Sequence, residues 1–183
     1  MSLPYDPQEI SRLVAGPKPA VMVFDYLRAG LKRDAACGLL TALVYDMPSM
    51  RSCRVFSDDL DAYPVGNYKR LVAGPYFEKV VMGKAPFATT DIEGVAELFF
   101  DWRKIQELGF ESSLNIPAVV GGELIGTANL LAPKGTYTPM TAARALLWQP
   151  VITLAFLLLT RPGAEGETFH DGLLIAGEGK VEG

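Results

Sequence analysis

The side chains best suited to chemistry in this 183-residue sequence are two cysteines, one histidine and a short acidic run. Cys37 and Cys53 lack the paired spacing of a zinc site, and His170 lies in a Gly-rich segment where it would be a poor base for a hydrolytic triad. The acidic run at residues 58–61 lacks the glycine and glutamate spacing of a calcium loop, so we expect a solvated loop there. These residues predict no catalytic or metal site, and we expect a protein that is not an enzyme.

Phosphate chemistry is not indicated either. The isolated glycines, such as Gly66, match neither of the glycine-rich patterns that cradle phosphates. The formal net charge is -4, and no run of lysines or arginines gathers the positive potential that a nucleic acid requires. Asp91, Glu93 and Glu97 stand at the start of an expected helix, where negative charge is favourable, so we interpret them as helix caps. Nucleic acid is therefore not expected as a partner.

The composition favours a cytoplasmic globular domain. Two cysteines are too few for a secreted disulfide scaffold, which favours a reducing compartment. The N-terminus lacks a basic region followed by an apolar stretch, so no signal peptide is expected. The longest apolar run, Val151 to Leu159, is much shorter than the roughly 20 residues that span a bilayer, so no membrane association is expected either.

The first elements that the pattern predicts are a helix and a hairpin. Pro19 stands where a first helical turn tolerates a missing N–H, apolar residues recur at helical spacing up to Leu31, and Gly38 is a natural stop. Two short apolar stretches, Leu39 to Tyr45 and Arg51 to Ser57, flank a turn and predict paired strands.

A long excursion and a final helix are predicted further along. From Asp58 to about Gln106, short helical pieces alternate with turns, and Pro86 to Thr90 favours a brief strand. Thr138 is a suitable N-cap and Pro139 a suitable first residue for the final helix, which Pro150 interrupts and kinks. We therefore predict an N-terminal segment (1–18), one domain (19–160) and a tail (161–183) in which Gly172 to Ile175 can add an edge strand.

The clearest pattern is a second hairpin around Gly121-Gly122, where two glycines accept the positive φ values of a tight turn. If these glycines form the loop, Val120 pairs with Glu123, and counting back sets Asn115 opposite Ala128 and Leu114 opposite Asn129. The two asparagines, Asn115 and Asn129, then point to opposite faces of the sheet unless a bulge intervenes. Both faces are largely apolar, so we expect the sheet to be covered on both sides, with each asparagine bonded to neighbouring backbone or held for a ligand or water.

This order of helix, hairpin, excursion, hairpin and helix resembles the GAF domain family over about residues 19–160. The sharpest part is the strand Ser112-Ser113-Leu114-Asn115-Ile116-Pro117 paired with Ile125-Gly126-Thr127-Ala128-Asn129-Leu130-Leu131 after the Gly-Gly turn. The resemblance implies an α+β fold with a central antiparallel sheet. It also implies that the N- and C-terminal helices pack on one face and that the loop and helix excursion covers the other.

The resemblance further implies a ligand pocket between the sheet and the excursion. By analogy with the family, it would be lined by Tyr63, Tyr68, Tyr76, Phe77, Phe87, Trp102 and one of the two asparagines, Asn115 or Asn129. Aromatic walls with a few polar tips suit a small, partly planar molecule. The alternative is that these rings simply fill a core beneath the long excursion.

Several specialisations of the family can be compared with the residues present. The Asn-Lys-Phe-Asp-Glu string of cyclic-nucleotide-binding members is absent, and no histidine in 19–160 is available for a bilin or a haem, so no cofactor is identified. The free methionine sulfoxide reductases place cysteines in the excursion, whereas this chain has none between Asp58 and Leu131. We therefore expect a sensory domain that binds an unidentified small molecule and acts as a homodimer. A ligand-free interaction module and, more weakly, a cysteine-based oxidoreductase remain alternatives.

Overall fold

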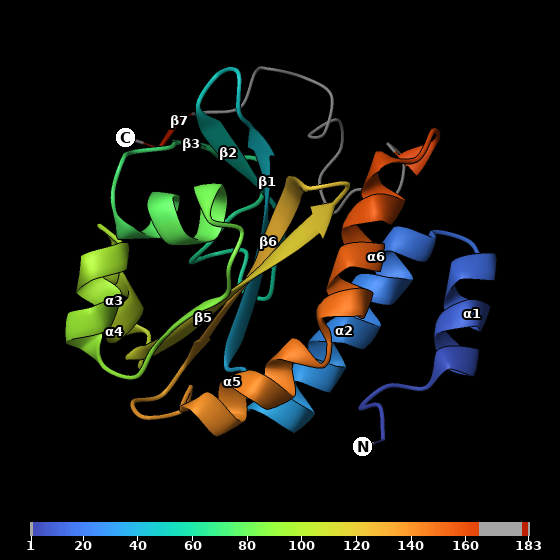
Figure 1. The fold of residues 1–183 in the computed structure, drawn as a ribbon, viewed down its shortest axis with the longest axis horizontal. Coiled ribbons are helices and arrows are strands. Elements are labelled where there is room, and N and C mark those ends of the chain that lie inside the picture. Colours follow the sequence, from blue (N-terminus) through green and yellow to red (C-terminus); the bar gives the residue numbers. More distant parts are fainter. Residues whose placement is uncertain (1, 165–180, 183) are drawn as a thin grey trace.

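The computed structural model describes residues 2–164 and 181–182 and has a seven-stranded sheet at its centre (Figure 1). The spatial order of the strands is β4-β5-β6-β1-β2-β3-β7. Every described pair is antiparallel except β3 with β7. The strands are β1 (Leu39–Asp46), β2 (Arg51–Ser57), β3 (Tyr68–Arg70), β4 (Phe87–Thr89), β5 (Ser112–Val120), β6 (Glu123–Ala132) and β7 (Val181–Glu182). The predicted α+β class is confirmed. His170 and Gly172 to Ile175 lie outside the described residues.

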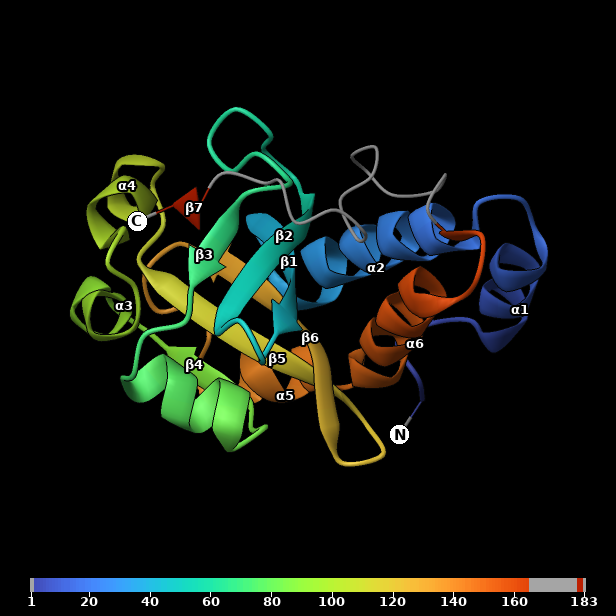
Figure 2. The ribbon, with the colours of Figure 1, turned by 90° about the horizontal axis from the view of Figure 1, so that it is seen from above.

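One face of the sheet is covered by the terminal helices, as Figures 1 and 2 show from two directions. These helices are α2 (Pro19–Ala35), α5 (Pro139–Leu146) and α6 (Gln149–Thr160), and α1 (Pro7–Ala15) lies outside them. α2 and α6 pack on each other and on the sheet, and α1 packs against α2 on the outside. The predicted packing of the first and last helices on one face is therefore confirmed, and α1 is an addition that the sequence analysis did not predict.

Helix α2 begins where it is predicted to begin but ends earlier than expected. Pro19 occupies its first turn, and its apolar stripe, which includes Phe24 and Leu27, is buried. Ala36 enters the left-handed region at φ 49° and stops the helix before Gly38. Gly38 has a different role: a Cβ there would lie 2.5 Å from a ring carbon of Phe110, so only glycine allows this ring to approach.

The predicted C-terminal helix is two helices in the structure. The Thr138 hydroxyl caps α5 by accepting a hydrogen bond from the Thr141 N–H, and Pro139 occupies the first turn. The chain then bends by 47° before α6, in which Pro150 again lies in the first turn. In the described part of the chain no single helix is long and apolar enough to cross a membrane, and α5 and α6 reach that length and composition only when taken together across their bend.

The excursion covers the opposite face of the sheet. Besides β3 and β4 it contains a π-helical turn, η1 (Phe77–Met82), and two short helices, α3 (Ile92–Leu98) and α4 (Trp102–Glu107). Asp91 caps α3 by accepting a hydrogen bond from the Gly94 N–H at 2.9 Å, as its position predicts.

The expectation of a solvated acidic loop is wrong for Asp58. Its side chain is almost fully buried and forms ion pairs with Arg28 at 3.3 Å and Lys32 at 3.2 Å. Its carboxylate also accepts a hydrogen bond from the Leu40 N–H at 3.0 Å. Asp58 therefore joins α2 to the start of β1, a contact between distant segments that local sequence patterns do not reveal.

The register of the second hairpin corrects the predicted faces of the asparagines. Val120 pairs with Glu123 and Val119 with Leu124 as expected, but Ala118 then pairs with Gly126, which leaves Ile125 as an extra residue. This bulge shifts every later pair by one residue. Asn115 consequently lies opposite Asn129, and both asparagines face the excursion.

The two faces of the sheet differ in polarity. On the helix side, Leu40, Leu114 and Leu130 are buried in the main core. Their strand neighbours Leu39 and Leu131 belong to a smaller core beneath the excursion, as the alternation of side chains along a strand requires. The excursion side also carries the buried polar residues Thr127, Asn115 and Asn129, so any polar binding site of the sheet is expected on this side.

Candidate functional site

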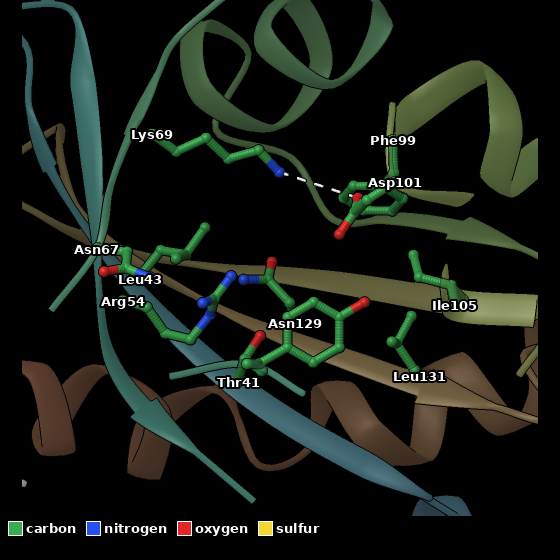
Figure 3. A pocket seen from close by; sticks show the side chains of 11 residues that line it. Thr41, Leu43, Arg54, Asn67, Lys69, Phe99, Asp101, Ile105, Asn129 and Leu131 are labelled. Carbon is green, nitrogen blue, oxygen red and sulfur yellow. Dashed lines mark ion pairs between the residues drawn. The ribbon is translucent and has the colours of Figure 1, made fainter. Parts of the chain in front are cut away.

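A small, partly open cavity lies between the excursion and the strands β1, β2, β3 and β6 (Figure 3). Its volume is about 60 Å³, room for about two waters, each of which takes about 30 Å³ in the liquid. The lining residues are Thr41, Leu43, Arg54, Tyr63, Asn67, Lys69, Phe99, Asp101, Ile105, Asn129 and Leu131. Polar side chains from several elements converge on this cavity, as they do in small-molecule sites, although its volume is small for one.

Arg54 brings a positive charge to the floor of this cavity. It lies on β2 opposite Leu43, next to the bulge at Ala42 and Leu43, and its residue is only 8% exposed. Its Nη1 donates a hydrogen bond to the Pro64 carbonyl at 2.8 Å, and its guanidinium carbon lies 4.9 Å from the centre of the Tyr63 ring. These contacts hold the guanidinium in one place, which is what recognition of a ligand by its planar fork requires.

Lys69 and Asp101 lie across the cavity from Arg54. Lys69 comes from β3 and Asp101 from the segment between α3 and α4, and their Nζ and Oδ1 atoms are 4.0 Å apart. Figure 3 shows this ion pair at one side of the space into which Arg54 and Asn129 also point. A separation of 4.0 Å is an ion pair without a hydrogen bond, so the two charged groups attract each other across a gap.

Asn129 connects the cavity to a buried hydrogen-bond network. Its Oδ1 accepts hydrogen bonds from Asn115 Nδ2 at 2.8 Å and from the Tyr76 hydroxyl at 3.4 Å. The Tyr76 hydroxyl also bonds to the Tyr45 hydroxyl at 2.7 Å, and Tyr45 bonds to Thr127 Oγ1 at 2.8 Å. The network thus joins β1, β5 and β6 to the start of the excursion helix η1.

A second cavity of about 130 Å³ adjoins the first and shares the walls formed by Leu43, Lys69 and Phe99. Its remaining walls are mostly apolar and come from the excursion and from β2 and β3. They are formed by Ser52, Arg70, Leu71, Val72, Tyr76, Phe77, Leu98 and Phe100. The two spaces are divided by three side chains. The first, with more charged and amide residues in its walls, is the polar chamber and the second is the apolar chamber, although apolar atoms supply most of the wall surface of both.

Three buried polar atoms at this site lie outside the hydrogen bonds described above. Asn115 Oδ1 has no partner among the described residues, whereas the Tyr63 hydroxyl faces the Asp101 carboxylate, whose charge and hydrogen bonding add to the effect of burial in raising the pKa of Tyr63. Burial raises the pKa of Tyr63 well above its ordinary value, so this hydroxyl is protonated and can donate a hydrogen bond. An unsatisfied buried polar group costs about 1–3 kcal/mol, which a bound ligand can recover.

The structure brings some of the predicted site residues together and separates others. Tyr63 and Asn129 line the polar chamber, Tyr76 and Phe77 line the apolar chamber, and Asn115 lies behind Asn129.

Three predicted residues line neither chamber. Tyr68 packs beside Cys53 under Arg51, Phe87 lies under Lys79, and Trp102 is a half-buried member of the core beneath the excursion. Whether any of the predicted residues contacts a ligand stays a prediction.

The sequence analysis missed the charged residues of the site, Arg54, Lys69 and Asp101. Arg54 had a usable indication, because it stands between Cys53 and Val55 in the middle of a predicted strand, where a charge needs a reason. Lys69 and Asp101 have no such mark, since each stands among other polar or aromatic residues of the excursion.

The cysteines are buried and free, and neither lines the two chambers. Burial raises the pKa of Cys37 to about 12, and burial also raises the pKa of Cys53. Both thiols therefore stay protonated at neutral pH. This disfavours the thiolate chemistry that a cysteine-based oxidoreductase needs.

A mainly antiparallel sheet with terminal helices on one face and a pocket beneath an excursion on the other defines the class of this protein. No model of a protein family matches the sequence, and no curated protein matches it either. Solved structures do match. A GAF domain/HD domain protein from Geobacter sulfurreducens superposes with a TM-score of 0.59 at 16% identity, over 82% of this chain and 95% of that one.

Two further solved structures lead to the same conclusion. The GAF domain of a phosphoenolpyruvate-protein phosphotransferase from Coxiella burnetii matches with a TM-score of 0.60 at 16% identity, over 81% of this chain and 89% of that one. The GAF domain of a two-component sensor histidine kinase from Bacillus halodurans matches with a TM-score of 0.60 at 11% identity, over 75% and 92%. The chain therefore has the GAF-domain fold.

Proposed function

We propose that this protein is a non-catalytic sensory domain, located in the cytoplasm, that binds a small molecule between the sheet and the excursion. The observation that carries the proposal is the polar chamber, which brings the side chains of Arg54, Lys69, Asp101 and Asn129 together around a cavity beneath the excursion. Polar groups that converge on a concave site favour a small-molecule ligand. The fold supports the proposal, because one of its matches is a domain of a sensor histidine kinase.

The walls of the chamber also suggest how binding would be transmitted. Arg54 and Asn129 belong to the sheet, whereas Phe99, Asp101 and Ile105 belong to the excursion. A ligand that contacts both sets of residues binds best when the excursion is closed on the sheet, so it shifts the population toward that state. The terminal helices on the opposite face would then carry the change to a partner chain.

A thermal-shift screen of the protein against a library of neutral, cationic and anionic small molecules tests this function. A ligand at 100 times its Kd should add about 2.7 kcal/mol to the free energy of unfolding. Thr41→Leu places a bulkier side chain in the wall of the chamber, which reduces the space for a ligand and should abolish the shift. Thr160→Leu, at the exposed end of α6, should leave the shift intact. A library without any stabilising compound, or a shift that survives Thr41→Leu, would contradict the proposal.

The second candidate function is a ligand-free interaction module, and one surface feature favours it. A groove of about 590 Å³ runs along α5 and α6 and is lined mainly by apolar side chains, including Leu3, Leu154 and Leu157. Large apolar grooves are typical of protein interfaces. The occupant that we propose is a second copy of this chain, which would form the predicted homodimer.

A further inference from the structure

We infer that the ligand of the two chambers is a small uncharged carbonyl compound, whose oxygen accepts hydrogen bonds from Asn129 and Thr41 and whose apolar body lies in the apolar chamber. This inference rests on the proposed function and names the chemical class of the ligand. It follows from two hydrogen-bond donors without partners among the described residues, from charged groups that already have partners, and from mainly apolar walls.

Asn129 and Thr41 bring the two donors to one place in the polar chamber. They are directly opposite each other on the antiparallel strands β6 and β1, so their side chains share a face and start about 5 Å apart. The Asn129 Oδ1 accepts from Asn115 and Tyr76, but its Nδ2 donates to none of the described residues. The Thr41 hydroxyl likewise has no hydrogen-bond partner in the part of the chain that the structure describes. Both side chains extend from the sheet toward the cavity that they line (Figure 3).

Two donors that converge from neighbouring strands match one carbonyl oxygen. Such an oxygen has two lone pairs and carries no hydrogen, so it can accept from the Asn129 amide and from the Thr41 hydroxyl together. Asn129 is more than nine-tenths buried, and Asn115 and Tyr76 hold its Oδ1, so the direction of its N–H groups is set as well. A buried donor is costly to leave unpaired, and a bound carbonyl group would satisfy it.

The charged side chains of the polar chamber are already engaged, which favours a ligand without charge. The Arg54 guanidinium donates to a backbone carbonyl and packs on the Tyr63 ring. The Lys69 Nζ lies 4.0 Å from Asp101 Oδ1 and 4.2 Å from the centre of the Phe100 ring. The Asp101 carboxylate in turn faces the Tyr63 hydroxyl. A charged ligand would therefore give up its hydration without meeting an unengaged counter-charge among the described lining residues, whereas an uncharged ligand loses much less.

The adjoining apolar chamber sets the size of the body of the ligand. Its volume is about 130 Å³, and Leu71 and Leu98 are among its apolar walls. An apolar cavity of about 150 Å³ holds one benzene molecule, so this chamber suits a single ring or a branched alkyl group. The polar chamber, at about 60 Å³, leaves room for the carbonyl group. Leu43, Lys69 and Phe99 are the shared walls, and movement of the half-buried Phe99 would let one molecule occupy both spaces.

Isothermal titration calorimetry on the full chain tests the inference. The probes are acetophenone and benzamide, the hydrocarbon ethylbenzene, which lacks the oxygen, and benzoate and benzylamine, which carry a charge on the same ring. We expect acetophenone or benzamide to bind, and each of the other three to bind at least about fivefold more weakly, as the loss of one ordinary hydrogen bond implies. Ethylbenzene, benzoate or benzylamine binding within that margin of the better carbonyl compound would overturn the inference.

Two variants remove the donors one at a time. Thr41→Val keeps the branched shape and removes the hydroxyl, so the better carbonyl compound should bind about fivefold more weakly while ethylbenzene binding is unchanged. Asn129→Asp keeps an oxygen for Asn115 and Tyr76 but removes the N–H donors, and it should weaken carbonyl binding by about tenfold, with circular dichroism to establish that it folds. Thr90→Val makes the first change at an exposed residue outside both chambers and should bind as the wild type does. Unchanged carbonyl binding in Thr41→Val would overturn the inference, whether or not Asn129→Asp folds.

The result also distinguishes the inference from the function on which it rests. If the thermal-shift screen finds a chamber ligand and neither carbonyl compound binds, the chemical class is wrong and the sensory function stands. If neither the screen nor the titrations find any ligand, the proposed function fails and the inference fails with it.

Discussion

At the residue scale, Tyr76 is the side chain that joins the excursion to the sheet. Its hydroxyl contacts the Tyr45 hydroxyl at 2.7 Å, Thr127 Oγ1 at 3.3 Å and Asn129 Oδ1 at 3.4 Å. A network of this kind positions Asn129 beside the polar chamber, because the amide oxygen accepts from Tyr76 and from Asn115 on the same face. A bulge in a hairpin thus decides which groups a ligand would meet.

Tyr76→Phe should lower the free energy of unfolding by about 1–2 kcal/mol, because the substitution removes hydrogen bonds to the buried Tyr45, Thr127 and Asn129 side chains. Urea denaturation measures the change. Tyr26→Phe is the control, since that hydroxyl accepts a single exposed hydrogen bond from the Asp6 N–H and should cost less. Equal losses of unfolding free energy in the two variants would show that the buried network stabilises the fold no more than one exposed hydrogen bond does.

Cys37 allows a prediction about pH. Its pKa is raised to about 12 by burial, whereas an unfolded thiol titrates near 8.5. The contribution of the protonated thiol to stability is therefore complete below about pH 8.5 and is lost as the pH rises toward 12. At pH 8 a thiol reagent such as DTNB should label the native protein slowly and should label both cysteines rapidly in urea. Rapid labelling of Cys37 in the native state would contradict its burial.

At the element scale, the pairing of α2 with the bend between α5 and α6 depends on a glycine. A Cβ at Gly30 would lie 2.1 Å from Trp148 Cη2, and Trp148 is fully buried with its indole N–H donating to Asp34 at 3.1 Å. Helix α2 therefore approaches Trp148, at the bend between α5 and α6, so closely only because residue 30 has no side chain. The same principle operates on the sheet, where the Phe156 ring of α6 occupies the space beside Gly126.

Gly30→Ala should destabilise the protein by about 1–3 kcal/mol, although alanine is favoured over glycine in a helix by about 1 kcal/mol. Overpacking against the indole ring outweighs the gain in propensity. Gly74→Ala is the control, because a Cβ at that position meets nothing within 4 Å, and its effect should be small. Thermal denaturation of both variants checks the prediction, and a stabilised Gly30→Ala would show that Trp148 can move aside.

At the scale of the whole molecule, the sheet separates two kinds of surface. Its apolar side packs on the terminal helices, and its polar side faces the chambers beneath the excursion. The proposed ligand and the proposed partner chain would therefore lie on opposite faces of the sheet. The groove along α5 and α6 is the place where the proposed second copy would bind.

Leu157→Glu should disrupt the proposed homodimer, because Leu157 lines the groove and is 41% exposed in the single chain. Size-exclusion chromatography with light scattering measures the mass. We expect a dimer for the wild type and a monomer, or at least tenfold weaker association, for the variant. Met140→Glu places the same charge at an apolar residue that is 68% exposed and lies outside the groove, and it should remain dimeric. A monomeric wild type would exclude this interface.

The sequence by itself determined the two hairpins, the starts of α2 and α5 and the order of these elements. Pro19, Thr138-Pro139 and the Gly121-Gly122 turn mark the starts of helices and the tip of a hairpin, and the structure has those elements at those positions. These features depend on residues that are adjacent in the chain, through backbone φ preferences, capping and the period of apolar residues. The resemblance of this order to the GAF domain family implied the antiparallel α+β fold, and the apolar character of both sheet faces predicted that both are covered.

Only the tertiary structure decided the composition of the site. The extra residue Ile125 moved Asn129 to the face of Asn115, and a bulge of this kind depends on how the strand fits the helices behind it rather than on local propensity. Arg54 and Lys69 meet at one chamber although they come from different strands. Such convergence depends on contacts between residues far apart in the chain, whose energies no local pattern records.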